Sequence, residues 1–227
     1  MKRREFIELS ASTLGGLLIY SLAGAPMVAN SEEGTLKVPL RFFTRDEAQV
    51  IVAACERIFP ATGTGPGATQ AAAMVYIDHQ LAGPYGTDET RYTHPPFVDI
   101  PDSGYQGSEN PQQTYRAGIK SLGADFAALD GAQQDARLKG IERMHFFQLL
   151  RQHTIEGMFC DPMHGGNAGL VGWQMLGYPG PKMSYYAEIG KYNGVAYRHE
   201  PQSLSQILGR RVVPWEDEAW DAKRKKV

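Results

Sequence analysis

Residues 44–60 read TRDEAQVIVAACERIFP, which is the pattern of a complete amphipathic helix. Thr44 and Glu47 form a capping box, in which each side chain accepts a hydrogen bond from a backbone N–H that the first turn leaves unpaired. Pro60 ends the helix, because proline cannot continue the backbone hydrogen-bond ladder. The apolar residues between these limits recur at helical spacing and predict one buried face: Ala48, Ile51, Val52, Ala54, Cys55 and Ile58.

Four more helices are predicted along the chain. One covers residues 68–81 and is closed by Gly83-Pro84. Another begins at Asn110-Pro111, with asparagine as the cap and proline at the first helical position, and continues to Phe126. A short helix runs from the cap Asp130 to Ile141, and the most hydrophobic one covers residues 142–159. No stretch alternates with period two for long enough to predict a sheet. We therefore predict an all-α fold, a small helical domain with long irregular segments rich in proline and glycine.

The composition is that of one globular domain. The chain has 227 residues, of which 42% are hydrophobic and 21% charged. The formal net charge is −2, and the basic runs lie at the two ends of the chain, so we expect no nucleic-acid partner.

Two irregular segments, residues 84–109 and 160–201, hold many prolines, glycines and aromatic residues. Structureless loops of this length are uncommon inside compact domains. The aromatic residues either cover the protein's own core or contact another subunit, since aromatic residues are enriched at interfaces. We favour the second interpretation, with Trp173 close to the contact. The tail segment Trp215–Trp220 contains two tryptophans, so we expect it to pack against a protein surface rather than to remain free in solution.

The start of the chain is typical of an export signal. Arg3-Arg4 is followed by Phe6-Ile7, then by a modestly hydrophobic stretch at residues 14–22 and by small residues. Paired arginines with apolar residues at this distance resemble the twin-arginine signal. The alternative is a basic amphipathic helix of the mature domain, which Gly15-Gly16 would weaken by about 1 kcal/mol per glycine. We assign residues 1–29 to the signal and residues 30–227 to the helical domain. Cleavage after Ala23, cleavage after Ala25 and an uncut anchor all stay open.

Twin-arginine export has a physical consequence for function, because the translocase carries proteins that are already folded. A small protein with such a signal and no cofactor site of its own is a candidate carrier for a partner that lacks a signal. The twin-arginine translocase is then itself a partner.

Residues 146–181 read FFQLLRQHTIEGMFCDPMHGGNAGLVGWQMLGYPGP. This stretch resembles the gluconate 2-dehydrogenase subunit 3 family. In that family a helix with Arg-x-His-Thr-x-Glu-Gly precedes an Asp-Pro-x-Tyr-Gly-Gly-Asn turn, then Gly-Trp and Gly-Tyr-Pro. His164 stands where the family commonly has an aromatic residue, which is a mild departure. The residues that match are Arg151, His153, Thr154, Glu156, Gly157, Asp161, Pro162, Gly165, Gly166, Asn167, Gly172, Trp173, Gly177, Tyr178 and Pro179.

The resemblance implies a heterotrimer. Its other members are a large FAD-dependent dehydrogenase subunit of the glucose–methanol–choline oxidoreductase type and a membrane-bound cytochrome c subunit. The small subunit is expected to help the large one to mature and to cross the membrane, and to hold neither the FAD nor the haem c. The expected location is the periplasm, with attachment to the inner membrane through the complex. We therefore expect no catalytic residue and no metal in this chain.

A second interpretation is a metal or haem site, and the residues that suggest it are His153, Glu156, Cys160, Asp161 and His164. His153 and Glu156 share a helix face, but helical di-iron proteins use Glu-x-x-His twice, with further glutamates, and here the order is reversed and occurs once. We interpret His153 and Glu156 as structural residues that hydrogen-bond each other and the following turn. The alternatives are an independent periplasmic metal-binding protein or oxidoreductase that uses this region, and a generic module that binds a small ligand.

Several cofactor and enzyme motifs are absent from the sequence. Haem attachment needs Cys-x-x-Cys-His and an iron–sulfur cluster needs about four thiolates, whereas the chain has only Cys55 and Cys160. No dinucleotide-binding Gly-x-Gly-x-x-Gly follows a strand, and no Gly-x-Ser-x-Gly is present. We expect Cys55 to be a buried free thiol on its apolar helix face. A Cys55–Cys160 disulfide stays an open possibility, because exported proteins permit it.

Overall fold

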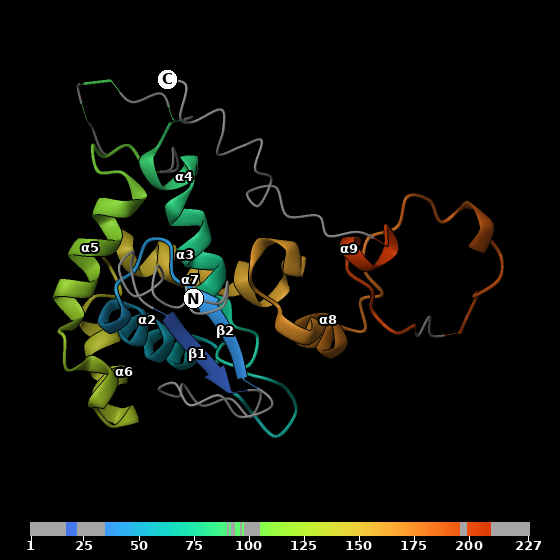
Figure 1. The fold of residues 1–227 in the computed structure, drawn as a ribbon, viewed down its shortest axis with the longest axis horizontal. Helices are drawn as coiled ribbons and strands as arrows, with labels where there is room; N and C mark the ends of the chain where they lie inside the picture. Colours follow the sequence, from blue (N-terminus) through green and yellow to red (C-terminus); the bar gives the residue numbers. More distant parts are fainter. Residues whose placement is uncertain are drawn as a thin grey trace, which may run out of the picture.

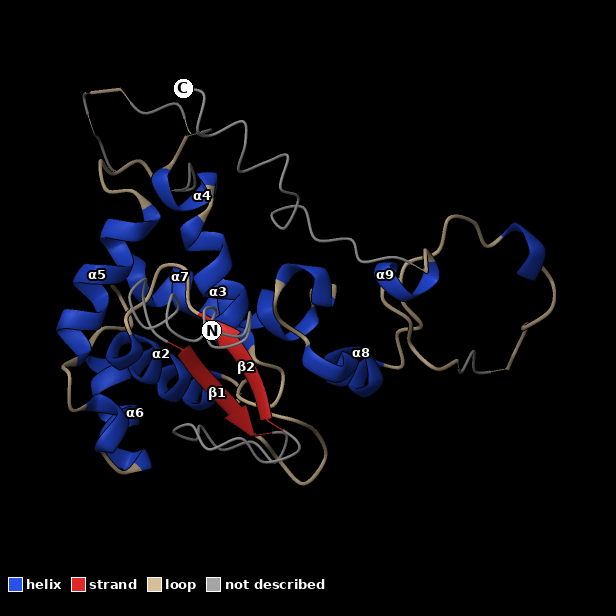
Figure 2. Ribbon diagram, in the orientation of Figure 1, coloured by secondary structure: helices blue, strands red, loops and turns tan. Residues whose placement is uncertain are grey.

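The architecture is mostly helical, as predicted (Figures 1 and 2). The computed structural model describes residues 17–21, 35–89, 91, 94, 95, 97, 105–195 and 199–209. The predicted signal residues Arg3, Arg4, Phe6 and Ile7 and the segment Trp215–Trp220 lie outside them. Within the described ranges, no helix is long and apolar enough to cross a membrane. The elements are β1 (Leu17–Ser21), β2 (Thr35–Pro39), α2 (Arg45–Ile58), α3 (Ala73–Ala82), α4 (Pro84–Thr87), α5 (Pro111–Leu122), α6 (Gly131–Gly140), α7 (His145–Phe159), α8 (Val171–Leu176) and α9 (Leu204–Ile207).

Three helix starts are confirmed at the predicted caps. The Thr44 side chain accepts from the Glu47 backbone N–H at 3.3 Å, and Glu47 accepts from the Thr44 N–H at 2.9 Å. Asn110 and Asp130 cap α5 and α6 in the same reciprocal way. These signals are local, so the sequence alone predicts them.

The prediction for α3 is wrong at its start. The helix begins at Ala73 rather than at Ala68, because Ala72 adopts the left-handed conformation with φ 53°. The segment before it is held by α2 instead. The two oxygens of Glu56 accept from the backbone N–H groups of Ala61 and Thr69, each at 2.9 Å. These tertiary hydrogen bonds outweigh the helix propensity of the alanine-rich sequence.

Two other boundaries differ by a few residues. Helix α5 ends at Leu122 rather than reaching Phe126, because Gly123 has a positive φ of 91° and turns the chain. Phe126 is nevertheless fully buried, in a single 3₁₀ turn. Helix α7 begins at His145 rather than at residue 142.

The core lies where α7 crosses α3, α5 and α2. Helix α5 approaches α7 at Gly118, where an added Cβ would lie only 2.0 Å from the Phe146 ring. The segment that precedes α2 is fixed by Asp78 of α3, whose buried carboxylate accepts from three successive backbone N–H groups, those of Arg41, Phe42 and Phe43. Buried carboxylates require such partners. Asp78 therefore fixes the segment that leads into α2 against α3.

One short antiparallel ribbon was not predicted. Strand β1 pairs with β2, with Leu17 opposite Pro39 and Ser21 opposite Thr35. Each strand has five residues, which is too short for period-two alternation to stand out. Strand β1 falls inside the stretch assigned to the export signal.

The C-terminal part of the described chain extends away from the helical body (Figure 1). Helix α8 leaves the body beside α7, and the orange-to-red segment that follows it projects outward and returns to α9. The molecule therefore has a packed helical body and a projecting segment.

Candidate functional site

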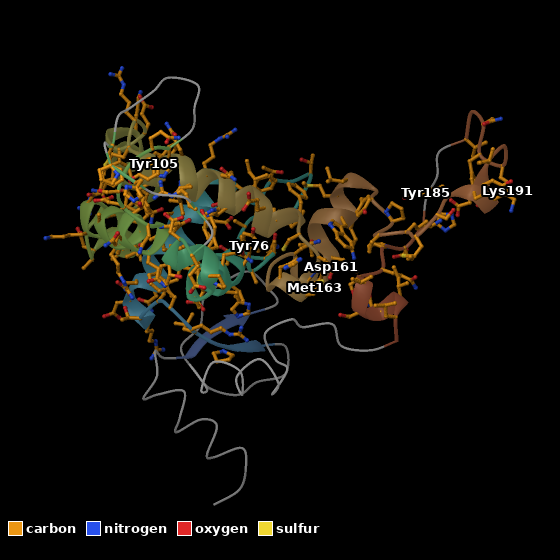
Figure 3. All side chains as sticks on the ribbon, turned by 90° about the horizontal axis from the view of Figure 1, so that it is seen from above. Tyr76, Tyr105, Asp161, Met163, Tyr185 and Lys191 are labelled. Carbon is orange, nitrogen blue, oxygen red and sulfur yellow. The ribbon has the colours of Figure 1, made fainter. Side chains whose placement is uncertain are left out.

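The motif of residues 151–179 occupies the second half of α7 and the turns that lead to α8. Two 3₁₀ turns, Pro162–His164 and Ala168–Leu170, connect these helices. Figure 3 shows Asp161 and Met163 at the junction between the body and the projecting segment. The structure thus places most of the predicted site residues together, around one turn.

Asn167 is the centre of this turn. It is fully buried and adopts the left-handed conformation, with φ 48°. Its backbone N–H donates to the Gly157 carbonyl at 2.7 Å, and its side-chain amide donates to the Cys160 carbonyl at 2.9 Å. Its side-chain oxygen accepts from the Gly172 N–H at 2.8 Å. One side chain therefore ties the end of α7 to the start of α8.

The motif glycines allow close approach between backbones. A Cβ on Gly157 would lie 2.8 Å from the Ala73 carbonyl oxygen, where α7 crosses α3. A Cβ on Gly166 would lie 2.2 Å from the Gly157 oxygen, and one on Gly172 would lie 2.0 Å from the Met158 oxygen. Real Cβ atoms do not come so close to backbone, so these positions require glycine.

Trp173 packs within its own chain. It is 5% exposed, and its indole N–H donates to the Phe159 carbonyl at 2.7 Å. Tyr178 meets its ring edge-on at 5.0 Å between centroids, and the turn between them passes through Gly177, whose φ is 66°. Trp173 therefore covers the protein's own core, which is the first of the two interpretations of the aromatic residues in residues 160–201 and not the one that we favoured.

Asp161 joins the turn to the projecting segment. One carboxylate oxygen accepts from the Met163 N–H at 3.0 Å, and the other accepts from the Leu204 N–H of α9 at 2.8 Å. Pro162 occupies the first position of the 3₁₀ turn, and the carbonyl of Pro179 accepts from the Gln202 N–H at 3.1 Å. Gly165, with φ 102°, passes beside the His79 ring.

The His153 ring is hydrogen-bonded to two tyrosines and not to Glu156. The Tyr85 hydroxyl is 2.9 Å from Nε2 and the buried Tyr115 hydroxyl is 2.9 Å from Nδ1. The predicted hydrogen bond between His153 and Glu156 is wrong, because the imidazole points to α4 and α5. Burial lowers the pKa of His153 to about 4, against a smaller opposing effect of Glu156. The ring is therefore neutral at pH 7, with one nitrogen donating and the other accepting.

Glu156 and Thr154 make different cross-helix contacts. The Tyr76 hydroxyl of α3 donates to one oxygen of Glu156 at 2.8 Å, and Gln152 donates to the other at 2.8 Å. Burial, followed by the hydrogen bond to Glu156, raises the pKa of Tyr76 above its ordinary value. The Thr154 hydroxyl donates to the Leu150 carbonyl at 2.7 Å and also lies 3.3 Å from the Cys55 sulfur of α2. These residues join α7 to α3 and α2.

Arg151 has a different setting from the other motif residues. It is exposed on α7 and lines a shallow hollow of about 440 Å³. The other residues that line this hollow are Glu142, Phe147, Gln148, Gln152, Ile155 and Glu156.

The chemistry that these groups can perform is limited by their protonation. Both cysteines are free thiols, and burial raises the pKa of Cys55 and of Cys160 to about 12. A thiol rather than a thiolate is a poor nucleophile and a poor metal ligand. In the described part of the chain, no three His, Cys, Asp or Glu side chains are grouped so that they could hold a metal ion. At pH 7 the His153 ring, its two tyrosines and both thiols are neutral, while the side-chain oxygens of Glu156 and Asp161 accept hydrogen bonds from protein groups.

Sequence reasoning missed the three tyrosines that complete the site. Tyr115 falls inside the helix predicted from Asn110-Pro111 to Phe126, and nothing in the sequence marks it as a partner of His153. Tyr76 and Tyr85 lie 80 and 68 residues away from their partners Glu156 and His153. Pairings at such separations depend on how the helices cross, and no local pattern indicates them.

The fold and the motif together define a small helical protein whose motif residues hold its own helices together. The model of gluconate 2-dehydrogenase subunit 3 matches residues 45–180, which covers the body from α2 to the base of the projecting segment. The chain belongs to the gluconate 2-dehydrogenase subunit 3 family. It is accordingly related to the subunits of a dehydrogenase complex. Neither a curated protein nor a solved structure matches the chain.

Proposed function

We propose that this chain is a non-catalytic small subunit of a periplasmic, flavin-dependent sugar or polyol dehydrogenase complex. It aids the maturation and twin-arginine export of the large flavoprotein subunit. The observation that carries the proposal is the family match over residues 45–180, in a chain whose motif is used for internal packing. The FAD belongs to the large subunit and the haem c to a membrane-bound cytochrome subunit. The complex lies in the periplasm at the inner membrane.

The contacts of His153 and Glu156 support the accessory role over an independent metal-binding or redox function. Both nitrogens of His153 lie at hydrogen-bond distance from tyrosine hydroxyls, and both oxygens of Glu156 accept hydrogen bonds. A metal at either residue would have to displace these bonds. Breaking them would leave buried polar groups unpaired, at about 1–3 kcal/mol each.

The first prediction concerns export. Replacing Arg3-Arg4 with lysines should reduce the flavin-loaded large subunit in the periplasm at least tenfold, because the partner travels on this chain's signal. The measurement is periplasmic dehydrogenase activity and bound flavin, compared with cytoplasmic levels. The matched control is Arg210-Arg211, the other arginine pair of the sequence, whose replacement with lysines should change neither. Normal periplasmic flavoprotein in the Arg3-Arg4 variant would show that the carrier idea is wrong.

The second prediction separates assembly from catalysis. His153→Ala removes the partner of two tyrosine hydroxyls, so it should lower the yield of assembled complex severalfold. The turnover per flavin of the complex that does assemble should stay within about twofold of the wild type, since His153 holds α4 and α5 rather than a substrate. Yield is measured by purification and turnover by activity per bound flavin. His199→Ala, at an exposed histidine, should change neither quantity. Full assembly with most of the turnover per flavin lost would contradict the accessory role.

A further inference from the structure

Among the residues that the structure describes, residues 181–195 project farthest from the body, and we call them the arm. Figure 3 shows Tyr185 and Lys191 at its far end, well away from the labelled residues of the body. The arm is closed at its base, where Gln202 donates to Pro179 and Leu204 donates to Asp161. It is therefore a defined loop carried by the motif turn rather than a loose tail.

The arm exposes apolar side chains that its own chain does not cover. Met183 is 101% exposed, Tyr186 83% and Ile189 75%, and Tyr185 and Val195 are at least half exposed. Exposed apolar side chains are normal when scattered singly, but here six of them fall within residues 183–195, and such a concentration favours an interaction site. Tyrosine and methionine are also enriched where proteins meet.

The backbone of the arm is already ordered by its own turns. Glu188 N–H donates to the Tyr185 carbonyl at 2.9 Å, and Lys191 N–H donates to the Glu188 carbonyl at 3.0 Å. Lys182 forms an ion pair with Glu188. A loop that is ordered before it binds loses less conformational entropy on docking. The outward-facing side chains are thus presented on a preformed support.

The charges of the arm indicate what kind of surface it fits. Its charged residues are Lys182, Glu188 and Lys191, and the first two neutralise each other. A strongly charged partner surface has little to pair with here. The complementary surface is apolar and nearly uncharged, with hydrogen-bond partners for tyrosine hydroxyls.

A lipid bilayer meets this description poorly. The arm is held by the single 3₁₀ turn Tyr186–Glu188 and by isolated turns, not by an α-helix or a closed sheet. Irregular backbone exposed to hydrocarbon leaves polar groups unsatisfied at several kcal/mol each. A protein surface can satisfy those groups.

We infer that the arm is the element by which this chain docks on the large flavoprotein subunit, while the motif turn at its base stays inside the fold. This inference rests on the proposed function, which supplies the partner. It divides the motif region into a part that builds the subunit, residues 151–180, and a part that binds, residues 181–195.

The test is a triple substitution in the full chain, Met183→Ser, Tyr186→Ser and Ile189→Ser, with the flavoprotein subunit as the probe. Truncating central apolar contacts typically weakens an interface by about 10- to 100-fold. We expect a loss of this size in affinity, measured by titration with fluorescently labelled chain. We also expect residues 181–195 to be protected from hydrogen exchange in the wild-type complex. The matched control is Met144→Ser and Ile155→Ser, two partly exposed apolar residues of the body outside both predicted contact segments, which should leave the affinity unchanged.

The outcomes distinguish the two ideas. Wild-type chain that does not bind the flavoprotein contradicts both the proposed function and the docking role. Wild-type chain that binds, with an arm variant that binds equally well, overturns the docking role alone. Binding of the wild-type arm to phosphatidylethanolamine–phosphatidylglycerol vesicles, or dimers of the isolated chain that the arm variant abolishes, would assign the arm to a membrane or to a second copy and also overturn it. Because the arm lies outside the core, the variant should keep the wild-type unfolding midpoint, which confirms that lost affinity is not lost folding.

Discussion

Replacing Asn167 with alanine should destabilise the protein by about 3–8 kcal/mol, which is a large share of the stability of a typical domain. The substitution removes the donor to the Cys160 carbonyl and the acceptor for the Gly172 N–H. Each buried group left without a partner costs about 1–3 kcal/mol. Alanine also bears the cost of a left-handed conformation, about 1–2 kcal/mol for residues other than glycine, asparagine and aspartate.

A series at this one position separates the two effects. Asn167→Gly loses the same side-chain hydrogen bonds but tolerates φ 48°, so it should be about 1 kcal/mol less destabilised than Asn167→Ala. Free energies of unfolding from urea titrations measure both variants. The matched control is Asn193→Ala on the exposed arm, which should stay within about 0.5 kcal/mol of the wild type. A loss below 1 kcal/mol for Asn167→Ala would show that the turn is held by other contacts.

The parts of the fold that the sequence predicted are those set by neighbouring residues. The side chains of Thr44, Asn110 and Asp130 each cap a helix by accepting from the backbone N–H three residues further along. All three caps are confirmed. The wrong start of α3 has a different origin, because the oxygens of Glu56 bind a segment that sequence patterns favoured as helix. The periodicity of apolar residues cannot show that a glutamate on another helix competes for the backbone.

The sequence predicted which residues form most of the candidate site, but not which contacts these residues make. We predicted that the motif residues from Asp161 to Trp173 belong to an irregular segment that contacts another subunit. Glycines and prolines without an apolar periodicity do not indicate which side of a segment packs on the core. In the structure these glycines are the packing surface, because Gly166 and Gly172 sit against the backbone of α7. In the described part of residues 160–201, the arm keeps an exposed, apolar character. The role of a glycine is decided by the backbone that approaches it, and that backbone lies elsewhere in the sequence.

Acidification should unfold this protein well before its carboxylates are fully protonated. Two histidines carry the largest shifts, and burial also lowers the pKa of a third, His145. Burial lowers the pKa of His153 to about 4, and burial together with Arg41 lowers the pKa of His79 to about 4. In the unfolded chain both have pKa values near 6.5. Between pH 6.5 and pH 4 the unfolded state therefore binds up to two more protons than the folded state.

The sign of the effect follows from linkage, since stability rises with increasing pH, and falls as the pH falls, wherever the unfolded state binds more protons. The contribution of each histidine is fully present above pH 6.5 and is lost as the pH falls to about 4, amounting to roughly 3 kcal/mol apiece. The ion-paired carboxylates act in a lower window. Hydrogen bonds from Arg137 and Arg57 lower the pKa values of Asp125 and Asp135, so their contributions are lost only below the ordinary aspartate range. Asp78 acts in the opposite direction, because burial raises its pKa.

Urea unfolding at a series of pH values between 7 and 4 measures the effect directly. The free energy of unfolding should fall by several kcal/mol over this range, with a slope that approaches about 2.7 kcal/mol per pH unit where both histidines contribute. His153→Gln should remove about one proton, and hence about half of that slope, even though it lowers stability at pH 7 through its lost tyrosine contacts. Asn193→Gln, at an exposed residue without a titratable side chain, should leave the slope unchanged. A wild-type protein whose stability is flat from pH 6.5 to pH 4.5 would mean that His153 and His79 are protonated in the folded state. That result would require hydrogen-bond acceptors at both rings in place of the neutral packing described above.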